Sequence, residues 1–134
     1  MDTQGKLTEN FTWNEALYLK QWDVHVAPPE VVYNHMLRFS KKVQMVRDFL
    51  RNPMHVTSWY RPEVYNSLVK GAKHSWHRRG GALDFYCKDI KADKVRELLL
   101  PRLADIGIRM EDLPGSNWVH IDDKEPINKR YFKP

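Results

Sequence analysis

Two segments of the chain carry apolar residues at the three- and four-residue spacing that places side chains on one face of an α-helix. The first covers about residues 30–51 and follows the prolines at 28–29, which suit a first helical turn. The second covers about residues 91–106 and stops at Gly107, a residue that often closes a helix. Both segments are expected to be amphipathic helices, with buried positions Val32, Met36, Phe39, Val43, Val46, Leu50, Val95, Leu98, Leu99, Leu103 and Ile106.

Shorter stretches in which apolar and polar residues alternate predict β-strands. They lie at residues 54–59, 82–86 and 117–122, with an edge strand at 108–110. A short helix is expected over about 13–20, after a capping box formed by Thr12 and Glu15, and another over 63–70. Helices combined with a small, largely antiparallel sheet make an α+β domain.

The length of 134 residues predicts one domain, residues 1–134, with residues 1–10 as a flexible lead-in and 123–134 as a charged surface tail. The formal net charge of +5 favours acidic partners. Charges of both signs are interspersed, and the chain has neither a long basic stripe nor a nucleic-acid motif. We therefore expect no nucleic-acid partner.

The amino terminus is polar and lacks the apolar segment of a signal peptide, and no apolar run is long enough to span a bilayer. We expect synthesis in the cytoplasm and no membrane insertion. Cys87 is the one cysteine, so no internal disulfide forms and no oxidising compartment is required. If the protein acts outside the cell, another factor must carry or release it.

His77, Asp84 and His120 are the candidate metal ligands. His77 lies in a glycine-rich turn, Asp84 lies on the strand that follows, and His120 lies on the last predicted strand. A single histidine or aspartate is usually a structural residue, but two imidazoles and a carboxylate are a typical ligand set for a catalytic zinc ion with one open position. The same donors would accept other divalent metals.

Asp122 lies two positions after His120 and therefore on the same side of the strand. It can orient a metal-bound histidine through a hydrogen bond, or it can take part in proton transfer. Both roles are open at this point.

Three motifs give the chain a resemblance to a known family. They are Val56-Thr-Ser58-Trp-Tyr60-Arg61-Pro62, Ser75-x-His77-x-x-Gly80-x-Ala82-x-Asp84 and Trp118-Val-His120-Ile-Asp122. In this order they resemble the zinc D-alanyl-D-alanine carboxypeptidase family, which has a hedgehog-like fold and includes D-Ala-D-Ala dipeptidases and phage L-alanyl-D-glutamate endolysins. The resemblance runs from about residue 7 to residue 131.

The resemblance implies specific roles for these residues. His77, Asp84 and His120 would bind one zinc ion, and Arg61 would bind the substrate carboxylate or stabilise the developing oxyanion. Tyr60, Ser75 and Trp76 are the further candidates for substrate binding, with Ser75 also supporting the loop.

The chain departs from the family pattern at three positions. Trp59 stands where glycine is usual and Trp76 where glutamine is frequent, so the two indoles are expected to reshape or narrow the cleft. Asn117 stands where many members carry an acidic general base. Asp122 is the first candidate for the missing base, followed by Glu111 and Asp112.

The resemblance therefore predicts a monomeric, zinc-dependent peptidoglycan peptidase that cleaves stem-peptide bonds, as a D-Ala-D-Ala carboxypeptidase or an endolysin-type endopeptidase. A phage-derived enzyme that acts on the cell wall after release fits the sequence best. The main alternative is a catalytically weak or silent, zinc-containing module that binds peptidoglycan. A basic nucleic-acid-binding protein that stacks Trp59, Tyr60 and Trp76 on bases ranks last.

Overall fold

A five-stranded sheet with the order β5-β6-β8-β7-β9 forms the centre of the fold. The computed structural model describes residues 1–125 and 129–134. β5 to β8 pair antiparallel with their neighbours, and β9 runs parallel to β7. The strands are β5 (Met54–Ser58), β6 (Ala82–Cys87), β8 (Val119–Asp122), β7 (Arg109–Glu111) and β9 (Tyr131–Phe132). The expected α+β class, with a small and largely antiparallel sheet, is confirmed.

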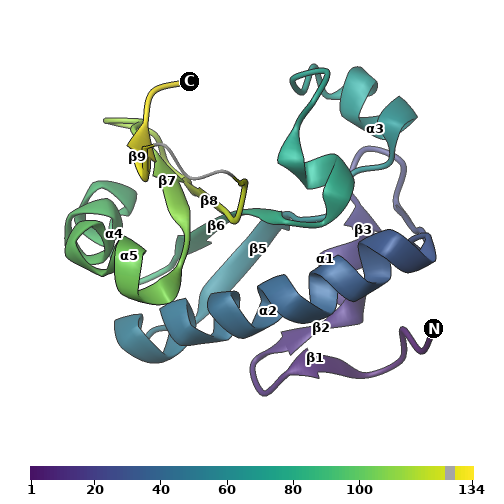
Figure 1. Ribbon diagram of the computed structural model, residues 1–134, viewed down its shortest axis with the longest axis horizontal. Coiled ribbons are helices and arrows are strands. Elements are labelled where there is room, and N and C mark those ends of the chain that lie inside the picture. Colours follow the sequence, from purple (N-terminus) through teal and green to yellow (C-terminus); the bar gives the residue numbers. More distant parts are fainter. Residues whose placement is uncertain (126–128) are drawn as a thin grey trace.

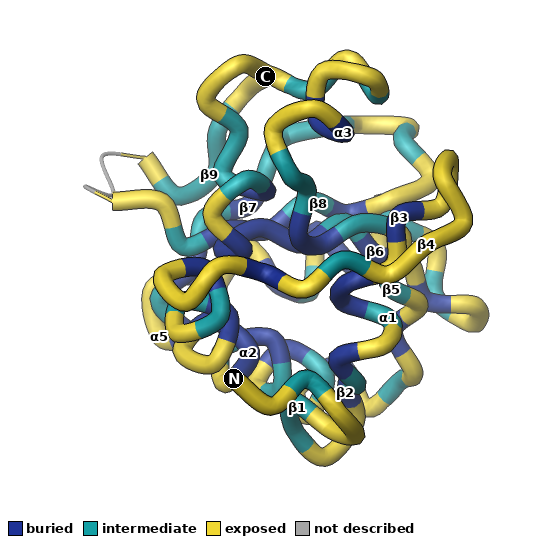
Figure 2. Tube along the Cα trace, turned by 90° about the vertical axis from the view of Figure 1, so that its right-hand side faces the viewer, coloured by how far each residue is buried: buried dark blue, intermediate teal, exposed yellow. Residues whose placement is uncertain are grey.

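The long helix α2 (Glu30–Leu50) covers one face of this sheet (Figure 1). Its predicted apolar stripe is buried, and Met36, Phe39, Val43 and Val46 have no exposed surface. These side chains belong to one core cluster with apolar residues of the sheet, among them Leu83, Phe85, Met110, Val119 and Ile121. Figure 2 shows the buried positions concentrated on the central strands and on α2.

The second predicted helix is interrupted. It consists of α4 (Ala92–Leu99), a 3-10 turn at Leu100–Arg102, and α5 (Leu103–Ile106). Pro101 explains the break, because proline has no backbone N–H and its ring clashes with the preceding turn. The expected apolar face survives, since Val95, Leu99, Leu103 and Ile106 are all buried.

The amino-terminal segment is more ordered than a flexible lead-in. β1 (Lys6–Thr8) pairs with β2 (Phe11–Thr12), and Thr8 and Asn10 are hydrogen-bonded to Gln44 of α2. The predicted capping box is present, and it begins a helix α1 (Trp13–Leu17) that is shorter than expected. Residues 18–20 leave that helix because β3 (Tyr18–Leu19) pairs with β4 (Val24–His25).

The carboxy-terminal segment also differs from the expected surface tail. β9 pairs with β7, so residues 109–111 form an inner strand rather than an edge. Asp123 is anchored to α2, since its carboxylate lies 2.8 Å from Nε2 of His35. Part of the predicted tail, residues 126–128, lies outside the described residues.

The face of the sheet opposite α2 carries the candidate site residues. Along β8 and β7, Val119, Ile121 and Met110 point into the core, whereas the residues that alternate with them point to the face opposite α2. Two segments that border this face are α3 (Glu63–Leu68) and the 3-10 turn η1 (Trp76–Arg79). Within the described residues, no helix combines the length and the apolar character that a bilayer crossing requires.

Candidate metal centre

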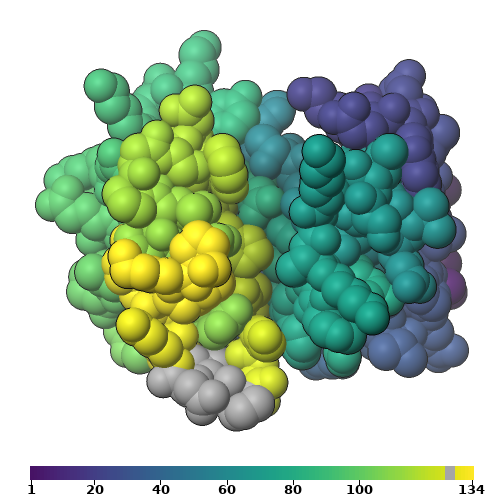
Figure 3. Space-filling model, turned by 90° about the horizontal axis from the view of Figure 1, so that it is seen from above, coloured from purple at the N-terminus to yellow at the C-terminus, as the bar shows by residue number. Residues whose placement is uncertain are grey.

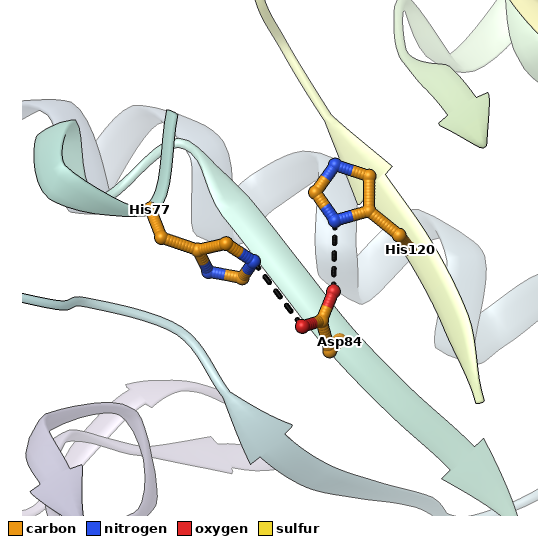
Figure 4. A group of neighbouring side chains, drawn as sticks. All are labelled: His77, Asp84 and His120. Atoms are coloured by element: carbon orange, nitrogen blue, oxygen red, sulfur yellow. Dashed lines mark hydrogen bonds and ion pairs between the residues drawn. The ribbon is translucent and has the colours of Figure 1, made fainter. Parts of the chain in front are cut away.

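His77, Asp84 and His120 converge at one point above the sheet, as Figure 4 shows. One ligand atom from each residue lies within 4.8 Å of the others. His77 Nε2 is 3.3 Å from Asp84 Oδ2, and His120 Nδ1 is 2.8 Å from Asp84 Oδ1. Asp84 and His120 are direct partners in the β6–β8 register, which fixes their side chains on the same face.

The turn that carries His77 is closed at both ends. Ser75 Oγ accepts a hydrogen bond from the backbone N–H of His77 over 3.2 Å, which caps η1. Gly80 ends η1 with a φ of 75°, and a Cβ at that position would lie 2.5 Å from Cγ of Met36. Only glycine fits this left-handed, close-packed corner. Ser75 thus supports the loop, as one of its two expected roles requires.

The tautomer of His77 follows from its contacts. Its Nδ1 lies 2.7 Å from the carbonyl oxygen of Trp59, which can only accept, so Nδ1 carries the proton. Nε2 is buried and has no hydrogen-bond partner among the described residues. Burial lowers the pKa of His77 even though Asp84 acts to raise it, and the ring is therefore neutral. An orphaned, buried lone pair that faces a carboxylate is the arrangement that a shared cation satisfies.

Asp84 supplies the negative charge of the centre. Burial alone would raise its pKa, but the neighbouring His77 and His120 hold the pKa well below its usual range. Arg61 adds a further contact, since Nη2 lies 3.2 Å from Asp84 Oδ2. The carboxylate is therefore ionised throughout the physiological range.

His120 lies between two carboxylates. Its Nδ1 faces Asp84, and its Nε2 lies 2.9 Å from Asp122 Oδ2. Burial acts to lower the pKa of His120, but hydrogen bonds to Asp122 and Asp84 raise it to about 9. If Nε2–H donates to Asp122, Nδ1 is left as the metal ligand.

The carboxylate of Asp122 accepts hydrogen bonds on both of its oxygens. Arg109 Nε donates to its Oδ1 over 2.7 Å, and Nη2 donates to Oδ2 over 2.9 Å, in addition to the bond from His120. Burial acts to raise the pKa of Asp122, but His120 and Arg109 lower it to about 2. These contacts favour the first of its two expected roles, the orientation of His120, over proton transfer.

The donor set fits a divalent metal. Two imidazole nitrogens and one ionised carboxylate are on one side of the centre, and each histidine is oriented by a second hydrogen bond to Trp59 or Asp122. Zinc is compatible with these donors and with this number of ligands.

Arg61 lies beside the centre. Its Nε donates to Ser58 Oγ over 2.8 Å, which fixes the guanidinium next to Asp84. A hollow runs along this side, lined by Thr57, Ser58, Arg61, Tyr65, Asp84 and Trp118. Figure 3 shows a furrow at the surface between the carboxy-terminal strands and the segment that contains α3. The position of Arg61 suits a group that binds an anionic part of a substrate.

Three expected substrate contacts lie elsewhere. Tyr60 and Ser75 line a separate hollow together with Lys73 and Arg78. Trp76 donates from Nε1 to Asp123 Oδ1 over 2.6 Å, so its indole is tied to the carboxy-terminal segment. The structure therefore groups Arg61 with the candidate metal ligands and leaves these three residues outside that group.

Trp59 does not narrow the cleft, contrary to expectation. Its side chain is 1% exposed and packs against Phe11 and Phe39 in the core. Nε1 donates to the carbonyl of Gly80 over 2.9 Å, so the indole supports the His77 turn from beneath. A burial of this kind has no signature in a single sequence, because tryptophan is common both in clefts and in cores.

Two side-chain contacts near the site were missed by sequence reasoning. Arg109 holds Asp122, and His35 holds Asp123. The first has a weak signal, because Arg109 alternates with the buried Met110 on a strand next to His120. The second depends on how α2 crosses the sheet, which no local pattern reveals.

Comparison with known proteins agrees with this geometry. Residues 9–122 match the family model described as Peptidase M15. A segment of 78 residues is 33% identical to the peptidoglycan L,D-endopeptidase MepK of Escherichia coli K12, and the proteins of that name from Escherichia coli O6:H1 and Shigella flexneri match equally. The match covers 54% of this chain and 41% of each relative, so it spans less than half of the relatives' length. The chain belongs to the peptidase M15 family, as most of its length matches that model.

Proposed function

We propose that the protein is a zinc-dependent peptidase that cleaves bonds in the stem peptides of peptidoglycan. The observation that carries the proposal is the orphaned Nε2 of buried, neutral His77, which faces the ionised Asp84 beside His120. Family membership supports peptide hydrolysis, and the peptidoglycan substrate named for the MepK relatives supports the substrate class.

The proposal gives each residue of the site a separate role. His77, Asp84 and His120 would hold the metal, which when bound would lower the pKa of a water molecule and polarise the scissile carbonyl. Asp122 and Arg109 keep His120 in the required tautomer and orientation. Arg61, fixed by Ser58, would pair with a carboxylate or with the carbonyl oxygen as negative charge develops on it.

Peptidoglycan stem peptides suit this site. They are short and carry free carboxylates, and the guanidinium of Arg61 borders the hollow next to the metal ligands. The relatives that match part of the chain are named L,D-endopeptidases, which favours cleavage within a peptide over removal of a terminal residue. We therefore propose an endopeptidase that cuts an L,D bond, with a terminal D-Ala-D-Ala bond as the second candidate. A monomeric, phage-derived endolysin, which reaches the wall after release, is the form that we expect from the sequence.

Product analysis tests the proposal. Metal-loaded protein is incubated with purified peptidoglycan and with defined muropeptides, and the masses of the products identify the bond. Fragments cut at an L,D bond are the expected result. Loss of a single terminal D-alanine would assign a carboxypeptidase instead. If folded, metal-loaded protein binds peptidoglycan and yields no product, the proposal fails and a binding module with Asn117 in place of the family's acid is the better account.

A further inference from the structure

A row of residues crosses the sheet on the face of the metal centre. Asp84 on β6 pairs with His120 on β8. The β7–β8 register places Arg109 opposite Asp122 and Met110 opposite Ile121, so the next residue of β7, Glu111, falls opposite His120. Residues that are direct partners on neighbouring strands point to the same face. Asp84, His120 and Glu111 therefore form one line across three strands.

Burial supports this orientation of Glu111. Met110 is fully buried in the core, and alternation along β7 turns its neighbours Arg109 and Glu111 to the opposite face. Arg109 does reach that face, because it binds Asp122. Phe132 of β9 pairs with Glu111, and its ring centre lies 6.0 Å from that of His120. Glu111 therefore lies, half-buried, between the strands that carry His120 and Phe132.

The Glu111 carboxylate differs from the other acids nearby. Asp122 is bound by Arg109 and His120, and Asp112 accepts from the hydroxyl of Tyr131 and pairs with Lys133. Within the described residues, no hydrogen bond engages the side chain of Glu111. Such a carboxylate is free to accept a proton.

The amide of Asn117 cannot act as a general base, and its position is also unsuitable for that role. It is exposed and lines a different hollow, together with Lys88 and Asp93. The base that many family members carry at this position is therefore missing from the chain, and β7 provides a carboxylate on the required face.

We propose that Glu111 is the general base of the reaction, an inference that rests on the proposed peptidase function. Glu111 accepts a proton from the attacking water as the oxygen–carbon bond forms at the scissile carbonyl. It then gives that proton to the departing amine as the carbon–nitrogen bond breaks. The net change is the addition of one water across the peptide bond, and the carboxylate ends as it began.

The variant Glu111→Gln tests the proposal, because it keeps the shape of the side chain and removes its basicity. With a soluble muropeptide as substrate, kcat should fall ~10²–10⁴-fold, the usual contribution of a general base. KM, and the affinity for zinc measured by competition with a chromogenic chelator, should stay within ~3-fold of the wild type. Glu111→Asp, which keeps the carboxylate but shortens its reach, should recover part of the lost kcat.

Asp112→Asn is the matched control, since Asp112 directly follows the last residue of β7 and its contacts are with Tyr131 and Lys133. Its kcat should stay close to that of the wild type. If Glu111→Gln keeps more than about a tenth of the wild-type kcat, or if it loses zinc in parallel with activity, Glu111 is not the base. If the zinc-loaded wild type cleaves nothing, the peptidase proposal falls first, and the role of Glu111 falls with it.

Discussion

Nε2 of His77 lies 3.3 Å from Oδ2 of Asp84, and neither atom has a proton to share. The opposite edge of the imidazole is committed to the carbonyl of Trp59, and the ring is buried. Two acceptors in contact repel each other in a low-dielectric interior unless a cation lies between them. This pair is therefore suited to hold a cation together with His120.

Replacement of His77 should abolish metal binding at this centre. We expect His77→Gln to lower zinc affinity by more than ~100-fold, since a direct ligand matters at least as much as a residue that orients one. Thermal unfolding measures the effect: a ligand at a hundred times its Kd adds about 2.7 kcal/mol to the wild type and should add almost nothing to the variant. His55→Gln, at an exposed histidine, is the control. An equal gain in stability for His77→Gln and the wild type would place the metal elsewhere.

Asp122→Asn should weaken zinc binding without removing a ligand. The amide cannot keep the paired hydrogen bonds from Arg109, and it can donate to Nε2 of His120 and so favour the wrong tautomer. The expected loss of affinity is ~10–100-fold. Asp123→Asn is a close control, because Asp123 contacts His35 and Trp76 rather than His120. Unchanged affinity in Asp122→Asn would show that the position of His120 does not depend on this carboxylate.

The stability of the metal-free protein should depend on pH through the same pair. The pKa of Asp122 falls from 3.8 to about 2 on folding, so its contribution is present above about pH 4 and is lost as pH falls through 2. The pKa of His120 rises from 6.5 to about 9, so its contribution is complete below pH 6.5 and is lost as pH rises through 9.

Both contributions are complete only between about pH 4 and 6.5, so the His120–Asp122 pair stabilises the fold most in that range. On acidification from pH 4 to 2, the part due to Asp122 should fall by about 2 kcal/mol. Urea unfolding of the wild type and of Asp122→Asn across this range measures the difference. A gap between the two proteins that does not narrow toward pH 2 would contradict the account.

Trp59→Phe should destabilise the fold rather than alter a cleft. The change removes the hydrogen bond to Gly80 and part of a fully buried side chain, for an expected loss of ~2–4 kcal/mol in the free energy of unfolding. Trp22→Phe, at a side chain that is 41% exposed, should cost less than about 1 kcal/mol. Guanidinium unfolding compares the stabilities of the two variants. If Trp59→Phe has wild-type stability and an altered substrate affinity, Trp59 lines the cleft and the account of its core position is wrong.

The candidate metal ligands were predictable because each lies in a local pattern. Two glycines bring the chain from His77 back to Asp84, and alternation places His120 and Asp122 on one face of a strand. The long helix α2 was predictable for the same kind of reason, since its apolar period extends over 21 residues. Periodic signals of this length survive the competing demands of tertiary packing.

The features that sequence reasoning missed depend on contacts between distant segments. β9 is a two-residue strand whose place beside β7 is set by pairing rather than by propensity. The core position of Trp59 depends on Phe11 and Phe39, which come from separate elements. Glu111 and Asp112 were equal candidates for the general base in the sequence. Only the register of β7 against β8 distinguishes them.

Reversible loss of activity on removal of the metal tests the central claim most directly. The protein is stripped with a chelator, dialysed, and assayed on purified peptidoglycan as zinc is added back in steps. The account predicts that cleavage disappears on stripping and returns fully at about one zinc per chain, and that His77→Gln stays inactive throughout. Cleavage by the stripped protein, or restored cleavage in His77→Gln, would show that the centre formed by His77, Asp84 and His120 does not carry the reaction.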